Sequence, residues 1–309
     1  MSIVTIQKCP VCNSINIKHD FLCIDYCVSR EKFDVYVCRQ CDFLFTNHFP
    51  SNHSMDKYYY DLKYISHSDI KKGFINKLYH FVRSYTVKRK LKFVCNQSKK
   101  KTGKILDIGC GTGYFLNEAK RKGWETFGIE KNERASKRAI ESFNMFVKPE
   151  HHIYKFPKAS FDVITLWHVL EQREDLNETM EKIYDLLLPD GIAVVALPNC
   201  SSYDAKHYRS YWAGYDVPRH LWHFTPKTME LFIKKFKFNI VYKCTMPFDA
   251  FYVSLLSEKY KKVNSFIAFV KAMFIGAVST VNALFDKNKS SAMIYVLKKT
   301  VDTPDSLKL

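Results

Sequence analysis

Short apolar runs alternate with helix-forming segments through the middle of the chain. The apolar runs predict strands at 104–108, 125–130, 161–167 and 192–197, with a weaker strand at 145–148. Helix-forming sequence follows the first run at Glu118 to Lys120 and recurs at 132–142 and 174–188. This alternation is typical of an α/β domain with a mostly parallel sheet. Right-handed crossovers then place ligands at the carboxyl ends of the strands.

The last part of the chain extends this sheet and interrupts it with an apolar insertion. The pattern predicts a helix and two antiparallel edge strands, at 225–236, 239–244 and 291–298. Residues 245–288 form the insertion, and within its segment 264–285 only Lys271 is charged. This segment is long enough to span a membrane, but a span would separate the two edge strands across the bilayer. A lid helix or an interfacial helix is therefore predicted.

The first 46 residues form a separate small module in the sequence. Cys9 and Cys12 make one C-x2-C pair, and Cys38 and Cys41 make a second, with two alternating stretches between them that predict a hairpin. Four thiolates at this spacing suit a tetrahedral Zn²⁺ ion in a ribbon. We interpret the zinc as structural, because four cysteines leave no open coordination position for chemistry.

Residues 47–103 connect the module to the sheet. The connector contains Tyr58, Tyr59, Tyr60 and Tyr64, which either pack the ribbon onto the next domain or reach over a cofactor. A basic helix is predicted at 70–95, with apolar residues at helical spacing: Phe74, Leu78, Phe81, Val82 and Tyr85.

Charge and composition narrow the functional classes. The formal net charge is +17, and residues 70–104 contain twelve Lys or Arg and no Asp or Glu. Such a surface suits nucleic acid, lipid headgroups or a phosphorylated substrate, or it is a solvated helix face. The first residues lack the pattern of a signal peptide, and ten cysteines in 309 residues do not indicate a secreted disulfide scaffold. A cytoplasmic location with reduced thiols is expected.

A glycine-rich turn follows the first strand of the sheet. It reads D-x-G-x-G-x-G from Asp107 to Gly113, with glycines at 109, 111 and 113. Neither the dinucleotide fingerprint nor the P-loop spacing fits. Glycines here let the backbone approach a ligand closely. Glu130 ends the second strand, 21 residues after Gly109, where an acid can bind both ribose hydroxyls of an adenosine.

The sequence resembles the class I S-adenosylmethionine (SAM)-dependent methyltransferases. Besides the glycine turn and Glu130, three stretches carry the resemblance, in the family's order: Phe161-Asp162-Val163-Ile164, Trp167-His168-Val169-Leu170-Glu171 and Leu187-Leu188-Pro189-Asp190-Gly191. The resemblance implies a Rossmann-like sheet that binds SAM through Asp107, Gly109, Cys110, Gly111, Gly113, Glu130 and Trp167. The family's acid after the third strand has no clear match; Glu150, beside His151 and His152, is the nearest residue.

An aromatic and histidine-rich segment, 200–226, follows the fifth strand and is the predicted acceptor loop. Its stretch from Trp212 to Leu221 resembles bacterial methyltransferases that carry a cysteine ribbon and act on small molecules, including sugars and quinones. Deprotonating a hydroxyl or carbon acceptor needs a base, and histidine is suited to that role near neutral pH. The predicted roles are a base at His220 or His168, an anion contact at Arg219, and acceptor orientation by Tyr215 and Asp216.

These patterns predict a SAM-dependent methyltransferase acting on a small-molecule, sugar or lipid-linked acceptor by O- or C-methylation. Two alternatives remain at this point: an RNA methyltransferase, favoured by the ribbon and the basic helix, and a SAM-binding scaffold or sensor. Nucleic acid is the less favoured partner. The basic helix and the apolar insertion further predict contact with an anionic membrane surface. The acceptor, the methylated atom and the oligomeric state stay open.

Overall fold

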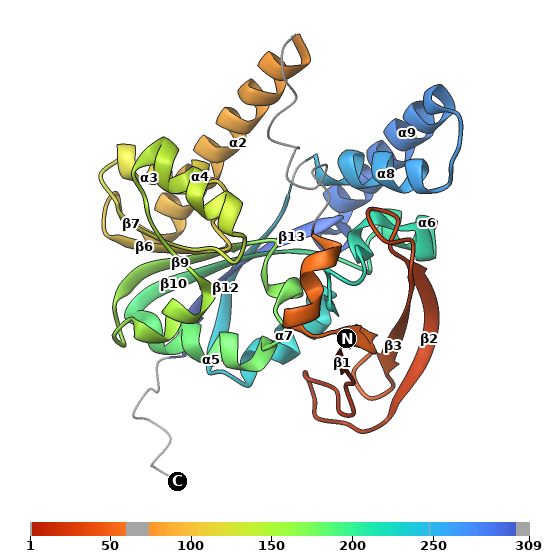
Figure 1. Ribbon diagram of the computed structural model, residues 1–309, viewed down its shortest axis with the longest axis horizontal. Coiled ribbons are helices and arrows are strands. Elements are labelled where there is room, and N and C mark those ends of the chain that lie inside the picture. Colours follow the sequence, from red (N-terminus) through yellow and green to blue (C-terminus); the bar gives the residue numbers. More distant parts are fainter. Residues whose placement is uncertain (1, 60–73, 247, 301–309) are drawn as a thin grey trace.

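The computed structural model describes residues 2–59, 74–246 and 248–300, with only the backbone described for 74–82. Its centre is a seven-stranded sheet in the order β12-β13-β10-β9-β6-β7-β8 (Figure 1). The strands are β6 (Lys104–Ile108), β7 (Glu125–Ile129), β8 (Phe146–Lys148), β9 (Phe161–Trp167), β10 (Leu187–Pro198), β12 (Phe238–Thr245) and β13 (Ala292–Lys299). The five strands from β10 to β8 are parallel, and β13 is antiparallel to both its neighbours. The predicted fold class is confirmed.

Helices bury both faces of the sheet, as the uninterrupted apolar strands require. On one face lie α2 (Phe74–Ser98), α3 (Tyr114–Arg121) and α4 (Glu133–Phe143), and on the other lie α5 (Leu176–Leu186) and α7 (Pro226–Lys234). Alternate strand residues feed the two cores: Ile105 and Val163 pack with α2 and α3, whereas Leu106 and Ile164 pack with α5 and α7. The basic helix therefore covers the sheet through its C-terminal half. The apolar face predicted for this helix cannot be followed at Phe74, Leu78, Phe81 and Val82, which lie outside the described side chains.

Local sequence accounts for the helix ends. Thr225 caps α7 in a reciprocal pair with Thr228, and Pro226 follows at the first helical position. The Asn132 side chain accepts the amide of Ala135 at the start of α4, and Asn144 ends that helix in the left-handed conformation. One boundary differs from expectation, because β10 begins at Leu187 rather than at 192. The strand bulges between residues 187 and 192, so the predicted turn lies within it.

The ribbon module is joined to the rest of the chain by strand pairing. Its sheet has the order β11-β4-β3-β2, and a separate pair, β1 with β5, brings the chain start beside residues 49–50. The strands are β1 (Ile3–Val4), β2 (Ile17–Ile24), β3 (Lys32–Cys38), β4 (Leu44–Asn47), β5 (Phe49–Pro50) and β11 (Trp222–His223). Since β11 belongs to the predicted acceptor loop, that loop completes the ribbon sheet.

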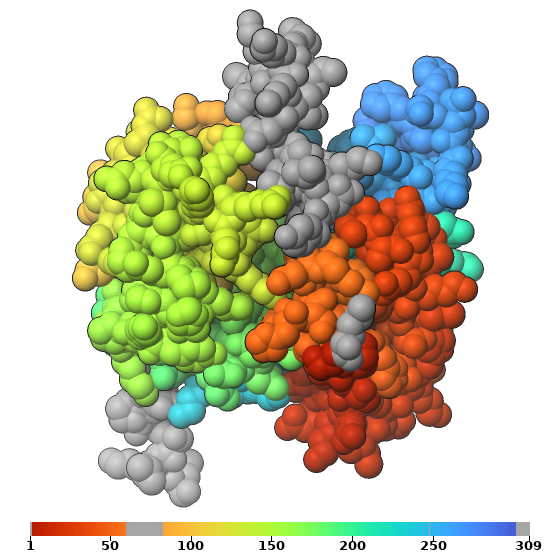
Figure 2. Space-filling view, in the orientation of Figure 1, coloured from red at the N-terminus to blue at the C-terminus, as the bar shows by residue number. Residues whose placement is uncertain are grey.

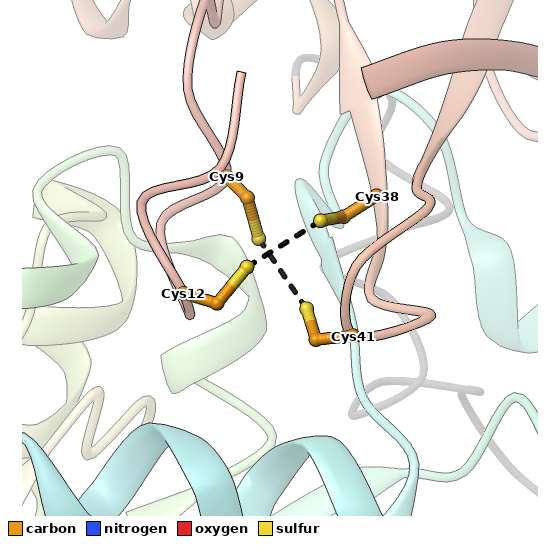
Figure 3. A group of neighbouring side chains, drawn as sticks. All are labelled: Cys9, Cys12, Cys38 and Cys41. Carbon is orange, nitrogen blue, oxygen red and sulfur yellow. Dashed lines mark hydrogen bonds between the residues drawn. The ribbon is translucent and has the colours of Figure 1, made fainter. Parts of the chain in front are cut away.

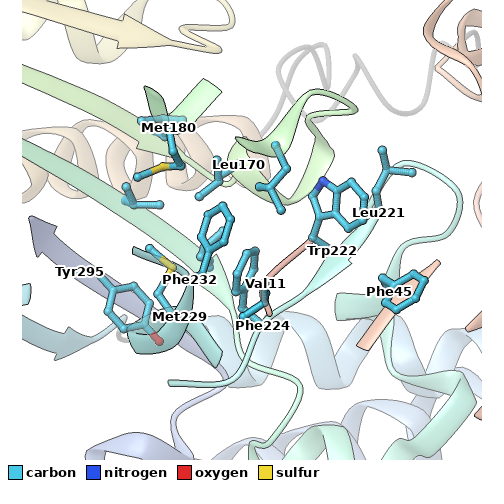
Figure 4. Close-up of a cluster of buried hydrophobic side chains, with 14 of the residues drawn as sticks. Val11, Phe45, Leu170, Met180, Leu221, Trp222, Phe224, Met229, Phe232 and Tyr295 are labelled. Carbon is cyan, nitrogen blue, oxygen red and sulfur yellow. The ribbon is translucent and has the colours of Figure 1, made fainter. Parts of the chain in front are cut away.

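The ribbon, the loop and the central domain also share a hydrophobic core behind the β4–β11 pairing. Figure 4 shows Val11 and Phe45 of the ribbon facing Trp222 and Phe224 of the loop, with Leu170 from the central domain beside them. The aromatic rings of Phe43 and Phe224 lie 4.9 Å apart. Consequently the first 46 residues are distinct in sequence but share one hydrophobic core with the central domain.

The insertion between the edge strands is a helical hairpin. Its helices are α8 (Asp249–Tyr260) and α9 (Ser265–Phe285), and α6 (Tyr203–Tyr208) packs against them. In the space-filling view the hairpin is the blue lobe that stands clear of the body at the upper right (Figure 2). Both edge strands that flank it pair along their length.

Candidate active site

The glycine turn lies at the carboxyl end of β6, as the alternation predicted. The amides of Gly109 and Cys110 donate to the carbonyl of Ile129, at 2.7 and 3.1 Å, which ties the turn to the end of β7. Gly109, Gly111 and Gly113 all have positive φ, at 73°, 54° and 80°. L-residues with a side chain adopt this region at a cost, so the turn requires glycine.

The three glycines serve different purposes. A Cβ on Gly109 would come within 2.3 Å of Val169, and one on Gly113 within 2.9 Å of Ala139, so both make room for neighbouring elements. A Cβ on Gly111 would meet no heavy atom within 4 Å, because this residue faces the open pocket. Gly111 thus leaves a cradle that a side chain would fill.

Glu130 faces the same opening from the end of β7. Its two carboxylate oxygens accept the amides of Gly111 and Asn132, each at 2.7 Å. Burial raises the pKa of this carboxyl, although the two amides and that of Lys131 oppose the effect. Because each carboxylate oxygen can accept more than one hydrogen bond, Glu130 keeps acceptor capacity for a pair of ribose hydroxyls.

These groups border a cavity of about 500 Å³, within the range of small-molecule sites. Its walls come from the connector, α2, the glycine turn and the end of β9, through residues that include Tyr59, Arg83, Gly111, Glu130, Trp167 and His168. Sequence reasoning missed Arg83, which lies 3.9 Å from the ring centre of Tyr114. Of the connector tyrosines, Tyr58 is buried and Tyr59 lines the cavity, while Tyr60 and Tyr64 lie outside the described residues.

Glu150, the residue nearest to the family's acid after the third strand, lies in the cavity wall. Glu150 lines the cavity and pairs with Arg173, which also bonds Asp175 at 2.8 Å. Trp167, whose indole nitrogen is buried without a hydrogen-bond partner among the described residues, also lines the cavity. The ammonium of Lys90 on α2 lies 4.3 Å from the Trp167 ring centre. Glu150 thus stands where an adenine contact was sought, engaged in an ion pair.

His168 is held between two carboxylates at the cavity. Its Nδ1 lies 3.6 Å from Oε1 of Glu171, and its Nε2 lies 3.6 Å from Oδ2 of Asp249 on α8. Burial alone would lower the pKa of His168, but Glu171 and Asp249 outweigh it, and the pKa is raised. Glu171 is 1% exposed, and neither of its carboxylate oxygens has a hydrogen-bond partner among the described residues.

His220, the residue predicted first as the base, lies on the other side of Glu171 and does not line the cavity. The Nε2 of His220 is 3.8 Å from Glu171, while its Nδ1 bonds the carbonyl of Gly214 at 2.9 Å. His220 therefore contacts the site through Glu171. The two histidines come together around one carboxylate, but only His168 reaches the cavity.

Arg219 and Tyr215 are not brought to the cavity. Arg219 is 1% exposed and bonds Asp25 of the ribbon at 2.9 Å, Asp216 at 2.7 Å and the carbonyl of Tyr58 at 3.0 Å. Its guanidinium ties the loop to the ribbon, so the anion-contact prediction does not fit this arrangement. Tyr215 and Asp216 do not fit acceptor orientation either, because Tyr215 is packed on Phe21 and Asp216 on Arg219.

Asp107 lies beneath the glycine turn rather than in the cavity wall. It is 3% exposed and accepts a hydrogen bond from the hydroxyl of Thr165 at 2.5 Å. Burial raises the pKa of Asp107 to about 7, against the opposing effects of Thr165 and the nearby Lys90 charge. Cys110, by contrast, lines the cavity. Asp107 therefore supports the turn from below.

The four ribbon cysteines converge (Figure 3). The sulfurs of Cys9 and Cys41 are 3.6 Å apart and those of Cys12 and Cys38 are 3.5 Å apart, and all four lie within 4.8 Å of one another. Four sulfurs around a tetrahedral Zn²⁺ at about 2.3 Å are about 3.8 Å apart, so this cluster has the dimensions of such a site. Lys235, at the C-terminal cap of α7, donates to the carbonyl of Pro10 at 2.6 Å, which holds the knuckle against the central domain.

Comparisons with known proteins identify a methyltransferase domain in this chain. The methyltransferase-domain family matches residues 79–243, more than half of the chain. A ubiquinone biosynthesis O-methyltransferase from Psychrobacter cryohalolentis is 29% identical over 105 residues, which cover 31% of this chain and 41% of that protein. The mitochondrial arginine-hydroxylase NDUFAF5 of Rattus norvegicus is 30% identical over 95 residues, covering 30% and 28%. The chain thus spans less than half the length of these curated relatives.

A solved structure shares the fold. Phosphoethanolamine N-methyltransferase 2 of Haemonchus contortus, in complex with SAM, superposes with a TM-score of 0.52 at 18% identity, over 84% of this chain and 63% of that one. At this identity the likeness extends to the fold alone. With the glycine turn, the acid at the end of β7 and the matched family domain, the chain belongs to the methyltransferase-domain family of SAM-dependent enzymes.

Proposed function

We propose that this enzyme transfers the methyl group of SAM to an oxygen or carbon atom of a small-molecule acceptor, with His168 as the base. The observation that carries the proposal is the position of His168, which lines the cavity beside the glycine turn and is flanked by Glu171 and Asp249 at 3.6 Å. The family match and the partial likeness to a ubiquinone biosynthesis O-methyltransferase support a small-molecule acceptor.

The residues of the cavity fit the cofactor. Gly111 leaves space for close backbone approach, and Glu130 has acceptor capacity for ribose hydroxyls. Trp167 and Glu150 lie on the walls where the adenosine would be enclosed. When bound, SAM supplies an electrophilic methyl group that is transferred by in-line displacement.

His168 would accept the acceptor's proton as the methyl group arrives. The imidazole must be neutral to do so, and it becomes positively charged on taking the proton. Glu171 and Asp249 stabilise that charge, and removal of a positioned base typically costs about 10²–10⁴ in rate. His220, on the far side of Glu171, would act as a positioning residue rather than as the base.

Methyl-labelled SAM tests this proposal against a panel of phenols, sugars, lipid-linked hydroxyl compounds and total RNA. Labelled small molecules are expected from the wild type. His168→Asn should reduce turnover at least about 10²-fold while keeping SAM affinity; asparagine suits the φ of 59° at this position. His48→Asn is the matched control, since this ribbon histidine also has a positive φ, 56°.

Other outcomes of the labelling assay would favour a different function. Labelled RNA, with salt-sensitive binding, would favour the RNA methyltransferase alternative. SAM binding without turnover on any acceptor would favour a sensor or scaffold. Full activity in His168→Asn would exclude His168 as the base. The relative named as an arginine hydroxylase makes a search for oxidised products a useful addition to the same assay.

We also propose that the ribbon binds one structural Zn²⁺ ion through Cys9, Cys12, Cys38 and Cys41. The sulfur separations support this proposal. A structural ion here would stabilise the ribbon, and through β11 the loop that follows β10.

A further inference from the structure

We propose that the α8–α9 hairpin is a docking surface for an anionic lipid bilayer, and that it delivers an apolar, lipid-borne acceptor to the cavity. The docking surface consists of the exposed apolar residues of the two helices and of the residue that precedes α8: Phe248, Tyr252, Leu255, Phe266, Ile267, Phe269, Val270, Phe274, Val281, Leu284 and Phe285. The second half of this inference rests on the proposed function. The first half stands on the hairpin alone.

Helix α9 is inverted relative to an ordinary surface helix. Its buried residues are nearly all small: Ala268, Ala272, Ile275, Gly276, Ser279 and Ala283. Its bulky residues point outward, with Phe266 75% exposed, Phe274 66% and Leu284 79%. A surface helix of a soluble protein normally turns its large apolar residues inward. Burial against the part of the chain that the structure describes therefore does not explain the aromatic residues of α9.

The small inward residues are required by close helix packing. A Cβ on Gly276 would lie 2.6 Å from the ring of Phe251 and 2.9 Å from its Cα, so α8 and α9 approach backbone to backbone. The hydroxyl of Ser279 bonds the buried carboxylate of Asp204 on α6 at 2.7 Å. These contacts fix which face of α9 is turned away from the protein, and Tyr252 and Leu255 on α8 are exposed as well.

The charge around this face favours anionic lipid. From Lys259 to Lys289 the chain has six lysines, and its one acid is Asp286. The lysines are Lys259, Lys261, Lys262, Lys271, Lys287 and Lys289. Apolar residues that enter the headgroup region, with lysines around them, are typical of peripheral membrane helices. A second copy of the chain is a poorer occupant, because a two-fold contact would bring these lysines against one another.

The connections hold the hairpin in the plane of the surface. Among the described residues, α9 is the one helix long and apolar enough to cross a membrane, and a third of its apolar window is buried in the protein. However, β12 before the hairpin and β13 after it pair from Phe238↔Lys299 to Thr245↔Met293. A spanning helix would have to separate these two strands. Docking along the surface leaves the sheet intact.

The hairpin also reaches the site. Asp249, in the first turn of α8, is the carboxylate 3.6 Å from Nε2 of His168. Phe248, immediately before it, is 68% exposed. The element that carries the docking surface thus carries one partner of the proposed base. An acceptor held in a bilayer at this surface would approach the cavity from the α8 side.

Vesicle flotation of the full-length, zinc-loaded protein tests the docking surface. Vesicles of phosphatidylcholine alone are compared with vesicles that contain about one third phosphatidylglycerol. Binding is expected to the anionic vesicles, with weakening by salt. Phe266→Ser combined with Phe274→Ser should weaken binding at least about ten-fold. Ile15→Ser, in an equally exposed residue of the ribbon (74%), should leave binding unchanged.

Two double lysine substitutions test the contribution of charge to vesicle binding. Lys287→Gln with Lys289→Gln should weaken binding to anionic vesicles several-fold. Lys137→Gln with Lys158→Gln removes two exposed charges away from the hairpin and should not weaken binding. Wild-type protein that binds neither vesicle at low salt would overturn the proposal. So would dimerisation, measured by sedimentation, that the paired Phe266 and Phe274 substitutions abolish. SAM affinity measured on the same variants separates failure of docking from failure of the proposed function.

Discussion

Substitution of Glu171 by glutamine should lower the pKa of His168 and so identify the carboxylate that tunes the proposed base. The substitution keeps the size of the side chain and removes one negative charge, 3.6 Å from Nδ1. At this distance the charge pair is worth about 1.2 kcal/mol at a water-like dielectric of about 80, and about 4.6 kcal/mol at about 20. Since one pKa unit corresponds to about 1.4 kcal/mol, these limits are roughly 1 and 3 units.

The expected shift is near the lower limit. The His168 side chain is 32% exposed, so solvent screens the pair, and Asp249 still contributes its own charge from the other side. We expect a decrease of about 1–2 units in Glu171→Gln and a comparable one in Asp249→Asn. The proposed base must be neutral, so the rate should rise with pH through the raised pKa of His168. In either variant this rise should move to lower pH.

The assay is an NMR titration of protein labelled in its histidine side chains, which needs no acceptor. The resonance of His168 is assigned by its loss in His168→Asn. Glu181→Gln, an exposed residue of α5, is the control for a general change of charge and should leave the titration in place. A wild-type pKa at or below the usual value for histidine, or no decrease in Glu171→Gln, would refute the assignment of Glu171 and the raised pKa together.

Three further predictions concern metal and stability. Cys41→Ser should lose one zinc per chain by elemental analysis and lower the melting temperature, whereas Cys27→Ser, outside the cluster, should keep its zinc. Asp107 retains a proton in the folded state up to its pKa of about 7, so the free energy of unfolding should fall as pH rises from 5 to 7. In urea titrations, Asp107→Asn should remove roughly 2–3 kcal/mol of that fall. An unchanged dependence of the unfolding free energy on pH in Asp107→Asn would contradict this prediction. Arg219→Met removes the cation that pairs with the buried carboxylate of Asp25 and with Asp216, and should cost about 3–5 kcal/mol. A loss below about 1 kcal/mol would contradict this ion-pair network.

Much of the fold followed from local patterns. The β6 and β9 boundaries match the predicted strands, since uninterrupted apolar runs between turn signals specify buried parallel strands. The glycine turn and the four cysteines could likewise be predicted from the sequence, because their chemistry depends on short spacings. Such features carry their information within about thirty residues. A single sequence therefore predicts them well.

Contacts between distant segments were not predictable in this way. The sequence pattern indicates that Arg219 is a loop cation, but Asp25 of the ribbon, 194 positions earlier, pairs with it in the core. The pairing of β11 with β4 and the approach of Asp249 to His168 also depend on tertiary packing. The spacing of apolar residues along the chain carries no information about such contacts. The order of the two predicted bases, with His220 placed before His168, failed to anticipate the cavity for the same reason.

The SAM site built on the glycine turn is tested most directly by calorimetry of SAM binding to Gly111 variants. The wild type should bind at micromolar concentration. Gly111→Ala should weaken binding at least about ten-fold and Gly111→Val should abolish it, because their side chains occupy the open cradle. Gly123→Ala is the control: it carries a similar cost of about 1–2 kcal/mol for a side chain at positive φ, remote from the cavity, and should bind as the wild type does. Unchanged affinity in both Gly111 variants would contradict the account.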